Sequence, residues 1–173
     1  MTKEIDPWAL AQELEKDIYI MANHTAGDQA CLALRRSYVR TVFSALEGIL
    51  YMLREDVIHS GELDTLFTPK QRAKLLEKAY KKGVVQKHDK YLPLREAIKF
   101  VPECFAKHMG ITDFKFPHQN EGWEQMQAAI EIRNNITHPK SVDVLNISVK
   151  DLETVVAAKV WFKDHVSSQL VVA

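Results

Sequence analysis

The stretch from Arg35 to Glu55 reads RRSYVRTVFSALEGILYMLRE and predicts a long helix with a broad apolar face. Apolar residues recur there every three or four positions, which is the period of an amphipathic helix. They are Leu32, Val39, Val42, Phe43, Leu46, Ile49, Leu50 and Leu53. A face this broad indicates a central helix that contacts several neighbours. We expect this helix to run from a cap at Asp28 to about Ile58.

Further helices are predicted on both sides of this central one. Asp6 and Pro7 are typical of a helix start, and apolar residues then recur at helical spacing as far as Met21. A third helix is expected over residues 69–82, closed by Gly83. A fourth is expected over residues 92–109, where Pro102 should kink or split it.

The C-terminal third predicts two more helices. One runs from about Gly122 to Thr137 or His138, and the other follows Ser148 and Asp151, which resemble a capping box. The segment 142–147 is expected to be briefly extended, and strand-like alternation is otherwise scarce. We therefore predict a single all-α domain over residues 1–173, a bundle of four main helices with one or two short ones.

Composition describes an ordinary globular chain. Apolar residues make up 46% and charged residues 27% of the 173 positions, and the 23 basic and 23 acidic residues balance, so net charge indicates no partner. Two cysteines are too few for a disulfide framework and favour a reducing compartment. No apolar run approaches the roughly 20 residues of a membrane span, and the N-terminus lacks a signal-peptide pattern. We expect a soluble, cytoplasmic protein with no membrane contact.

The stretch EIRNNITHPK, from Glu131 to Lys140, carries the most informative polar residues. Asn134 and His138 are four residues apart and share a helix face, while Arg133 flanks Met126 and Ile130. One interpretation is a plain helix end, since Arg and His complement the C-terminal dipole and Pro139 stops the helix. The other is a chemical site, because an unsatisfied Arg is costly on an apolar stripe.

The pattern RNNITH, an R-x4-H motif with Asn directly after the Arg, resembles the signature of the HEPN superfamily in its ribonuclease form. Most of the chain is similar to these all-α domains, with the motif late in the helix order and the central helix like their second core helix. The resemblance implies metal-independent RNA cleavage without a cofactor. It also implies catalytic roles for Arg133, His138 and Asn134, with support from Glu47.

The same resemblance implies a homodimer with a composite site and a role in a toxin–antitoxin or antiphage defence system, with an antitoxin or defence protein as a further partner. Two positions depart from the family. Lys140 stands where one toxin branch carries Tyr, so that branch's nucleotidyltransferase partner is not implied. Tyr51 stands where some members carry Lys four residues after the acidic position, so only Glu47 is carried over.

Basic residues gather in one segment. Residues 70–99 hold 10 Lys or Arg against 3 Asp or Glu, a net charge of +7. The candidate RNA contacts there are Lys70, Arg72, Lys74, Lys78, Lys81 and Lys82. The alternative is a solvated helix face. Cys104 and His108 have the spacing of metal ligands on a helix, but no cluster completes a site, so no metal is expected.

Two other functions are compatible with the same residues. The domain could be a non-catalytic HEPN-like module that binds a nucleotide or a protein and uses the polar motif structurally. It could also be a purely structural helical adaptor. Metal-independent cleavage of RNA would separate the enzyme from both.

Overall fold

A computed structural model describes residues 15–23 and 32–170 of the chain. The chain divides into two compact units. The first takes residues 1–49 and 117–165, and the second takes residues 50–116 and 166–173. We call them the first and the second unit and describe each by itself. The assignment of residues 1–173 to one domain stays a prediction.

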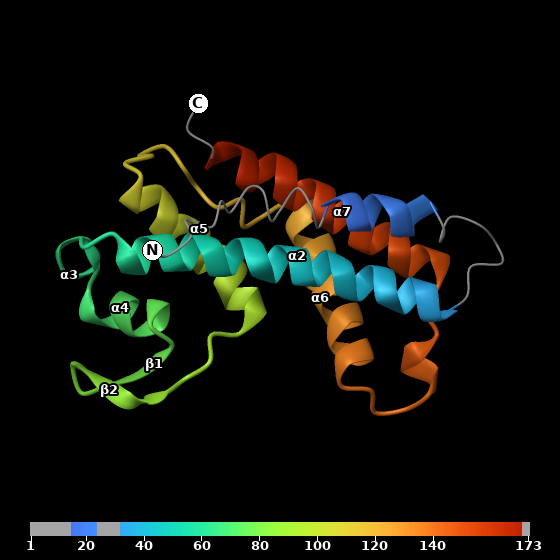
Figure 1. Ribbon diagram of the computed structural model, residues 1–173, viewed down its shortest axis with the longest axis horizontal. Helices are drawn as coiled ribbons and strands as arrows, with labels where there is room; N and C mark the ends of the chain where they lie inside the picture. The colour runs from blue at the N-terminus through green and yellow to red at the C-terminus, as the bar shows by residue number, and fades with distance from the viewer. Residues whose placement is uncertain (1–14, 24–31, 171–173) are drawn as a thin grey trace, which may run out of the picture. The chain divides into compact units, whose positions relative to one another are not determined.

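Helices dominate both units, which confirms the predicted α class (Figure 1). Within residues 32–170 the α-helices are α2 (Leu32–His59), α3 (Leu63–Leu66), α4 (Pro69–Leu75), α5 (Leu94–His108), α6 (Glu121–Thr137) and α7 (Val149–His165). Two 3-10 turns, η1 (Asp143–Leu145) and η2 (Ser167–Gln169), and two strands, β1 (Lys78–Lys81) and β2 (Val84–Asp89), complete the order. Residues 15–23 are also helical.

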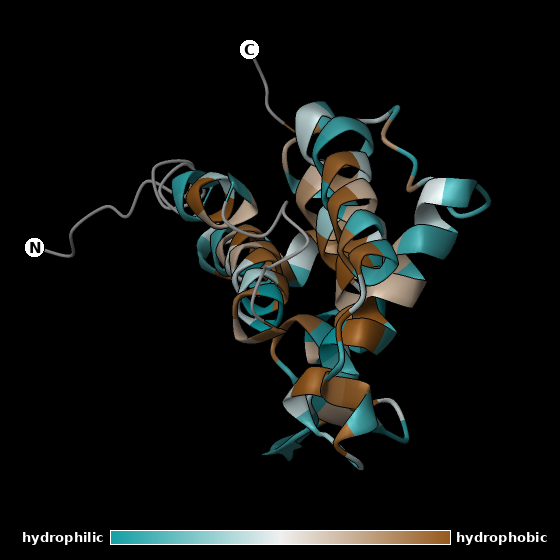
Figure 2. Ribbon diagram, turned by 90° about the vertical axis from the view of Figure 1, so that its right-hand side faces the viewer, coloured by the Kyte–Doolittle hydropathy of each residue, from teal (hydrophilic) through white to brown (hydrophobic). Residues whose placement is uncertain are grey.

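The predicted central helix is α2. Its end at His59 lies one residue from the predicted one, while the predicted cap at Asp28 and the predicted first-helix start at Asp6 lie outside the described residues. Seven of the eight predicted face residues lie within α2 as buried or half-buried side chains, and Leu32 is 39% exposed. Hydrophobic and hydrophilic residues alternate along the helical ribbons (Figure 2), as amphipathic helices require.

In the first unit, α6 packs beside α7 (Figure 1). The indole rings of Trp123 and Trp161 lie with their centroids 6.0 Å apart, and both side chains are buried. Local signals define both helix starts. The Asn120 side chain accepts a hydrogen bond from the Trp123 amide at 2.9 Å. The predicted capping box before α7 is confirmed, because Ser148 and Asp151 exchange hydrogen bonds.

Gly122 permits the close approach of α6 to α7. A Cβ atom at this position would lie 2.0 Å from Cδ1 of Trp161. Trp161 is only 6% exposed, so its indole cannot swing into solvent to make room. Glycine is therefore required here by packing rather than by backbone conformation.

The predicted third helix is confirmed in its first half and wrong in its second. It ends at Leu75 instead of continuing to Lys82, because Glu77 takes a left-handed conformation with φ of 49°. The chain then forms the antiparallel hairpin β1–β2. Lys82 and Gly83 join the paired residues Lys81 and Val84 with φ of 51° and 82°, as in a type I′ turn.

The segment 142–147 is not extended as expected, since residues 143–145 form the 3-10 turn η1. Pro102 does not split the fourth helix, because α5 is continuous through it, and a kink at Pro102 stays a prediction. Pro102 removes one backbone donor, but Ile98, Val101 and Phe105 are buried around it and their packing holds the helix together.

Across residues 15–23 and 32–170, no helix combines the length and the apolar character that a membrane crossing demands.

We expect Gly122→Ala to destabilise the first unit. An overpacked core contact of this kind costs about 1–3 kcal/mol, which lowers the melting temperature of a chain of this size by roughly 3–10 °C. Thermal unfolding followed by circular dichroism measures the shift. Adding Trp161→Leu should make the Gly122→Ala cost smaller than in the parent chain, whereas strictly additive effects would contradict a direct clash.

Candidate functional site

Helix α6 carries Arg133 on its buried side. Ala129, Ile130 and Ile136 lie three or four residues from Arg133 and are all buried, so they share a helix face with it. The Arg133 side chain keeps 21% of its surface exposed. The sequence-based interpretation that the polar motif prolongs an apolar stripe is therefore confirmed for Arg133.

Glu47 of α2 is the partner of Arg133. The Arg133 Nη2 group donates to Glu47 Oε1 at 2.6 Å, and Nη1 donates to Asn134 Oδ1 at 3.2 Å. The Glu47 side chain is 39% exposed, so the pair lies at the edge of the core rather than within it. A charge-assisted hydrogen bond of this length fixes the orientation of the guanidinium group. The contact shows that Glu47 faces Arg133.

His138 lies just past the end of α6, as the C-cap residue. Its backbone N–H donates to the Asn134 carbonyl at 2.8 Å, and its φ and ψ of −129° and 64° turn the chain out of the helix before Pro139. The imidazole is exposed. Within the described residues, no hydrogen bond or ion pair involves the His138 ring. The Asn134 side chain contacts Arg133 and not the His138 ring, so the catalytic role of Asn134 stays a prediction.

The apolar residues of α6 are largely covered within the chain. Trp123, Met126 and Ile130 are buried, and so are Ala129 and Ile136. Ala128 is exposed and Ile132 is half-buried. The apolar surface that α6 leaves open to a second chain is therefore narrow.

Three arginines of α2 were missed by the sequence analysis. Arg35, Arg36 and Arg40 donate to the carbonyl oxygens of Ile147, Leu145 and Ile136, at 3.0, 3.0 and 3.2 Å. These acceptors lie at the end of α6 and in the segment that follows it. Arg36, Arg40 and Glu47 recur at intervals of four and seven, which places them on one side of α2, and this spacing was the available signal.

The basic segment belongs to the second unit and is partly neutralised. Arg72 pairs with Asp64, Lys74 with Glu96, and Lys78 with Asp89. Lys70, Lys81 and Lys82 are exposed and have no carboxylate partner among the described residues. Lys81 and Lys82 lie at the turn of the β1–β2 hairpin instead of on a helix face. Three of the six candidate RNA contacts thus keep an unpaired charge.

Cys104 and His108 do not act together. Burial in α5 raises the pKa of the Cys104 thiol to about 12, with the Glu103 carboxylate adding to the effect. The His108 ring lies 3.1 Å from Glu62 Oε2 instead. Among the described residues, no three His, Cys, Asp or Glu side chains are grouped so as to hold a metal ion.

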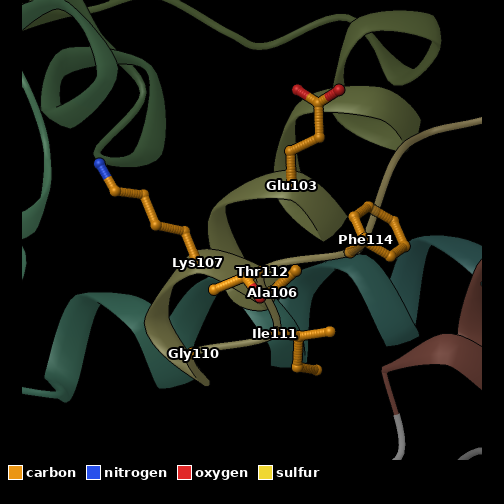
Figure 3. A pocket seen from close by; sticks show the side chains of 7 residues that line it. All are labelled: Glu103, Ala106, Lys107, Gly110, Ile111, Thr112 and Phe114. Atoms are coloured by element: carbon orange, nitrogen blue, oxygen red, sulfur yellow. The ribbon is translucent and has the colours of Figure 1, made fainter.

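A small pocket lies in the second unit, at the end of α5 (Figure 3). Its volume is about 250 Å³, and Lys107, Gly110, Ile111 and Phe114 are among its lining residues. The Lys107 side chain points away from Phe114 (Figure 3) and donates to the Leu66 carbonyl. None of the motif residues lines this pocket.

The comparisons with known proteins give no family for the chain. No protein-family model, no curated protein and no solved structure matches it significantly. The HEPN resemblance therefore rests on the motif, its neighbours and the helix order.

We expect a double-mutant cycle to show that Glu47 and Arg133 are coupled. Removing either partner leaves the other half-buried without its counter-charge, so each single Ala variant should lower the free energy of unfolding. The coupling free energy should be about 1 kcal/mol, which is the upper end of the range for exposed pairs, because Glu47 is partly solvated. Urea unfolding of the parent, Glu47→Ala, Arg133→Ala and the double variant measures it. A coupling of zero would contradict the ion pair.

Proposed function

We propose that this protein is a metal-independent endoribonuclease of the HEPN type that works as a homodimer in a toxin–antitoxin or antiphage defence system. The observation that carries the proposal is the Arg133–Glu47 contact of 2.6 Å at the same helix end as the exposed His138. An oriented, permanently charged guanidinium group and an accessible imidazole are the two chemical groups that the reaction needs.

The proposed reaction transfers a phosphoryl group within the RNA strand. The ribose 2′-oxygen forms a bond to the adjacent phosphorus while the bond to the 5′-oxygen of the next nucleotide breaks. One imidazole accepts the 2′-hydroxyl proton, and an imidazolium gives a proton to the leaving 5′-oxygen. The products are a 2′,3′-cyclic phosphate and a free 5′-hydroxyl end. No metal ion is needed, because side chains carry both proton transfers.

Arg133 is assigned to the phosphate. Charge develops on the non-bridging oxygens as the new bond forms, and a guanidinium group stabilises it with two parallel donors. A guanidinium group has five N–H donors, and the two contacts to Glu47 and Asn134 leave others available. Glu47 is then a positioning residue, and Asn134 supports the same guanidinium group.

A homodimer supplies what one chain lacks. Each chain carries one His138 and one Arg133 in the motif, whereas the mechanism uses a base and an acid together. A two-fold interface brings two copies of the same patch together and so doubles both groups. Exposed His138 and Ala128 are compatible with such an interface.

One observation favours a second function. Arg133 is held by Glu47 and Asn134, and the described residues offer the His138 ring no base or acid partner, so the polar motif could be a structural network. The alternative function is a non-catalytic HEPN-like module that binds a nucleotide or a protein. It shares the fold with the proposed enzyme and differs in chemistry.

We expect purified protein to cleave single-stranded RNA in the presence of EDTA. Arg133→Ala and His138→Ala should each lower the rate by at least about 100-fold, because each removes transition-state stabilisation or proton transfer. Gel analysis with end-labelled RNA measures the rate and identifies the cyclic phosphate product.

His59→Ala is the matched control, since His59 is an exposed histidine outside the motif, and it should cleave at the parental rate. Cleavage that survives in both motif variants would remove the assignment. Intact RNA together with a melting temperature raised by added nucleotide would favour the binding module.

We also expect activity to depend on dimer formation. Sedimentation should give a mass near twice the 19.8 kDa of one chain, and the rate per chain should fall as the protein is diluted through the dissociation range. His138→Ala should keep the dimer while losing activity. A rate per chain that is independent of concentration in a monomeric sample would contradict the composite site.

A further inference from the structure

A row of cationic side chains follows one side of α2 in the first unit. Arg36 and Arg40 are four residues apart, and Glu47 follows seven residues later on the same helix face. Along the helix axis the two arginines are about 6 Å apart. Arg35 adjoins them. We call Arg35, Arg36 and Arg40 the arginine row.

The row runs alongside the motif in the opposite chain direction. Arg36 contacts Leu145, Arg40 contacts Ile136, and Glu47 contacts Arg133, so contacts further along α2 reach earlier residues of the partner segment. His138 lies two residues after the Arg40 acceptor and before the Arg36 acceptor. The arginine row therefore borders the backbone that carries His138.

Among the described residues, no ion pair links the row to a carboxylate, and the carbonyl oxygens that accept its hydrogen bonds carry no net charge. Asp143 lies inside the contacted segment, is exposed and forms no ion pair with the row. Asp151, which follows the segment, accepts hydrogen bonds from Ser148 in the capping box. The Nε atom of Arg35 is buried without a hydrogen-bond partner, which is destabilising. The hydrogen bond that the Nη1 end of the same guanidinium group makes offsets this cost.

Hydrogen bonding to carbonyl oxygens does not by itself explain why all three donors are arginines. One neutral amide donor satisfies a carbonyl, whereas a guanidinium group brings five donors and a permanent charge. Arg36 is half-buried and Arg40 is exposed, so both present remaining donors to solvent. Permanently charged, forked donors at regular spacing are the groups that recognise successive phosphates.

We infer that the arginine row binds the backbone phosphates of single-stranded RNA next to the scissile bond. This inference rests on the proposed ribonuclease function and names the surface that holds its substrate. It also replaces the basic segment as the main RNA contact, because Arg72, Lys74 and Lys78 of that segment are paired with carboxylates. Arg36 and Arg40 are the principal binding residues, and Arg35 anchors the Ile147 end.

The test measures RNA affinity as a function of salt in the non-cleaving His138→Ala chain, by fluorescence anisotropy with a labelled single-stranded RNA. Gln at positions 36 and 40 keeps a donor for each carbonyl and removes the charge. Loss of two phosphate contacts should lower the slope of log affinity against log salt by about 1.4. Applied over one decade of salt concentration, this change in slope corresponds to a dissociation constant that is roughly 10- to 30-fold higher at 0.1 M salt.

Arg36→Lys with Arg40→Lys is the charge-retaining variant and should keep the parental slope. Arg95→Gln is the matched control, because Arg95 is an exposed arginine on α5 outside the row, and it should change neither slope nor affinity. In the cleaving chain, Arg36→Gln with Arg40→Gln should raise KM more than it lowers kcat.

Two results would overturn the inference in different ways. If the parent cleaves RNA but the Gln variants keep its slope and affinity, the row is only a backbone clamp and the proposed function stands. A drop in melting temperature without a change in slope leads to the same conclusion. If the parent neither binds nor cleaves RNA, the proposed function fails and the inference fails with it.

Discussion

The half-buried Arg133 is the constraint on which the first unit depends. It lies among the buried residues of α6, where a guanidinium charge without a partner would be strongly destabilising. Glu47 of α2, which lies 86 residues before Arg133 in the sequence, forms an ion pair with that guanidinium group. The pairing links α2 to α6, and the hydrogen bond from Arg40 to the Ile136 carbonyl is a second link between the same two helices.

The end of α6 is stabilised from the side rather than along its own axis. The last carbonyl groups of a helix have no partner within it, and the usual glycine cap is missing here because His138 and Pro139 follow. Arg40 of α2 supplies a donor to the Ile136 carbonyl in the last turn of α6. Arg36 supplies one to the Leu145 carbonyl at the end of η1, in the segment that follows. This leaves the backbone around His138 anchored while its imidazole stays exposed.

Local signals were readable from the sequence, and long-range ones were not. The start and end of α6 and the Ser148–Asp151 box depend on neighbouring residues and were predicted closely. The β1–β2 hairpin was missed because alternation over so few residues is weak and because Lys82, a residue that rarely adopts positive φ, precedes Gly83 in the turn. The spacing of Arg36, Arg40 and Glu47 was a local signal for the arginine row, but its carbonyl acceptors are about 100 positions away and no local pattern predicts them.

The same contact that stabilises Arg133 also limits what Arg133 can do. Glu47 offsets part of the guanidinium charge, so Arg133 by itself is a weak attractor for a polyanion but a well-oriented donor at close range. A phosphate-binding site needs both long-range attraction and short-range orientation. In the proposed site these two roles fall to different residues, because the arginine row has no carboxylate partner among the described residues and Arg133 is oriented by Glu47. Substrate attraction and chemistry would then be separable by substitution, as expected when positioning contacts and reacting groups come from different helices.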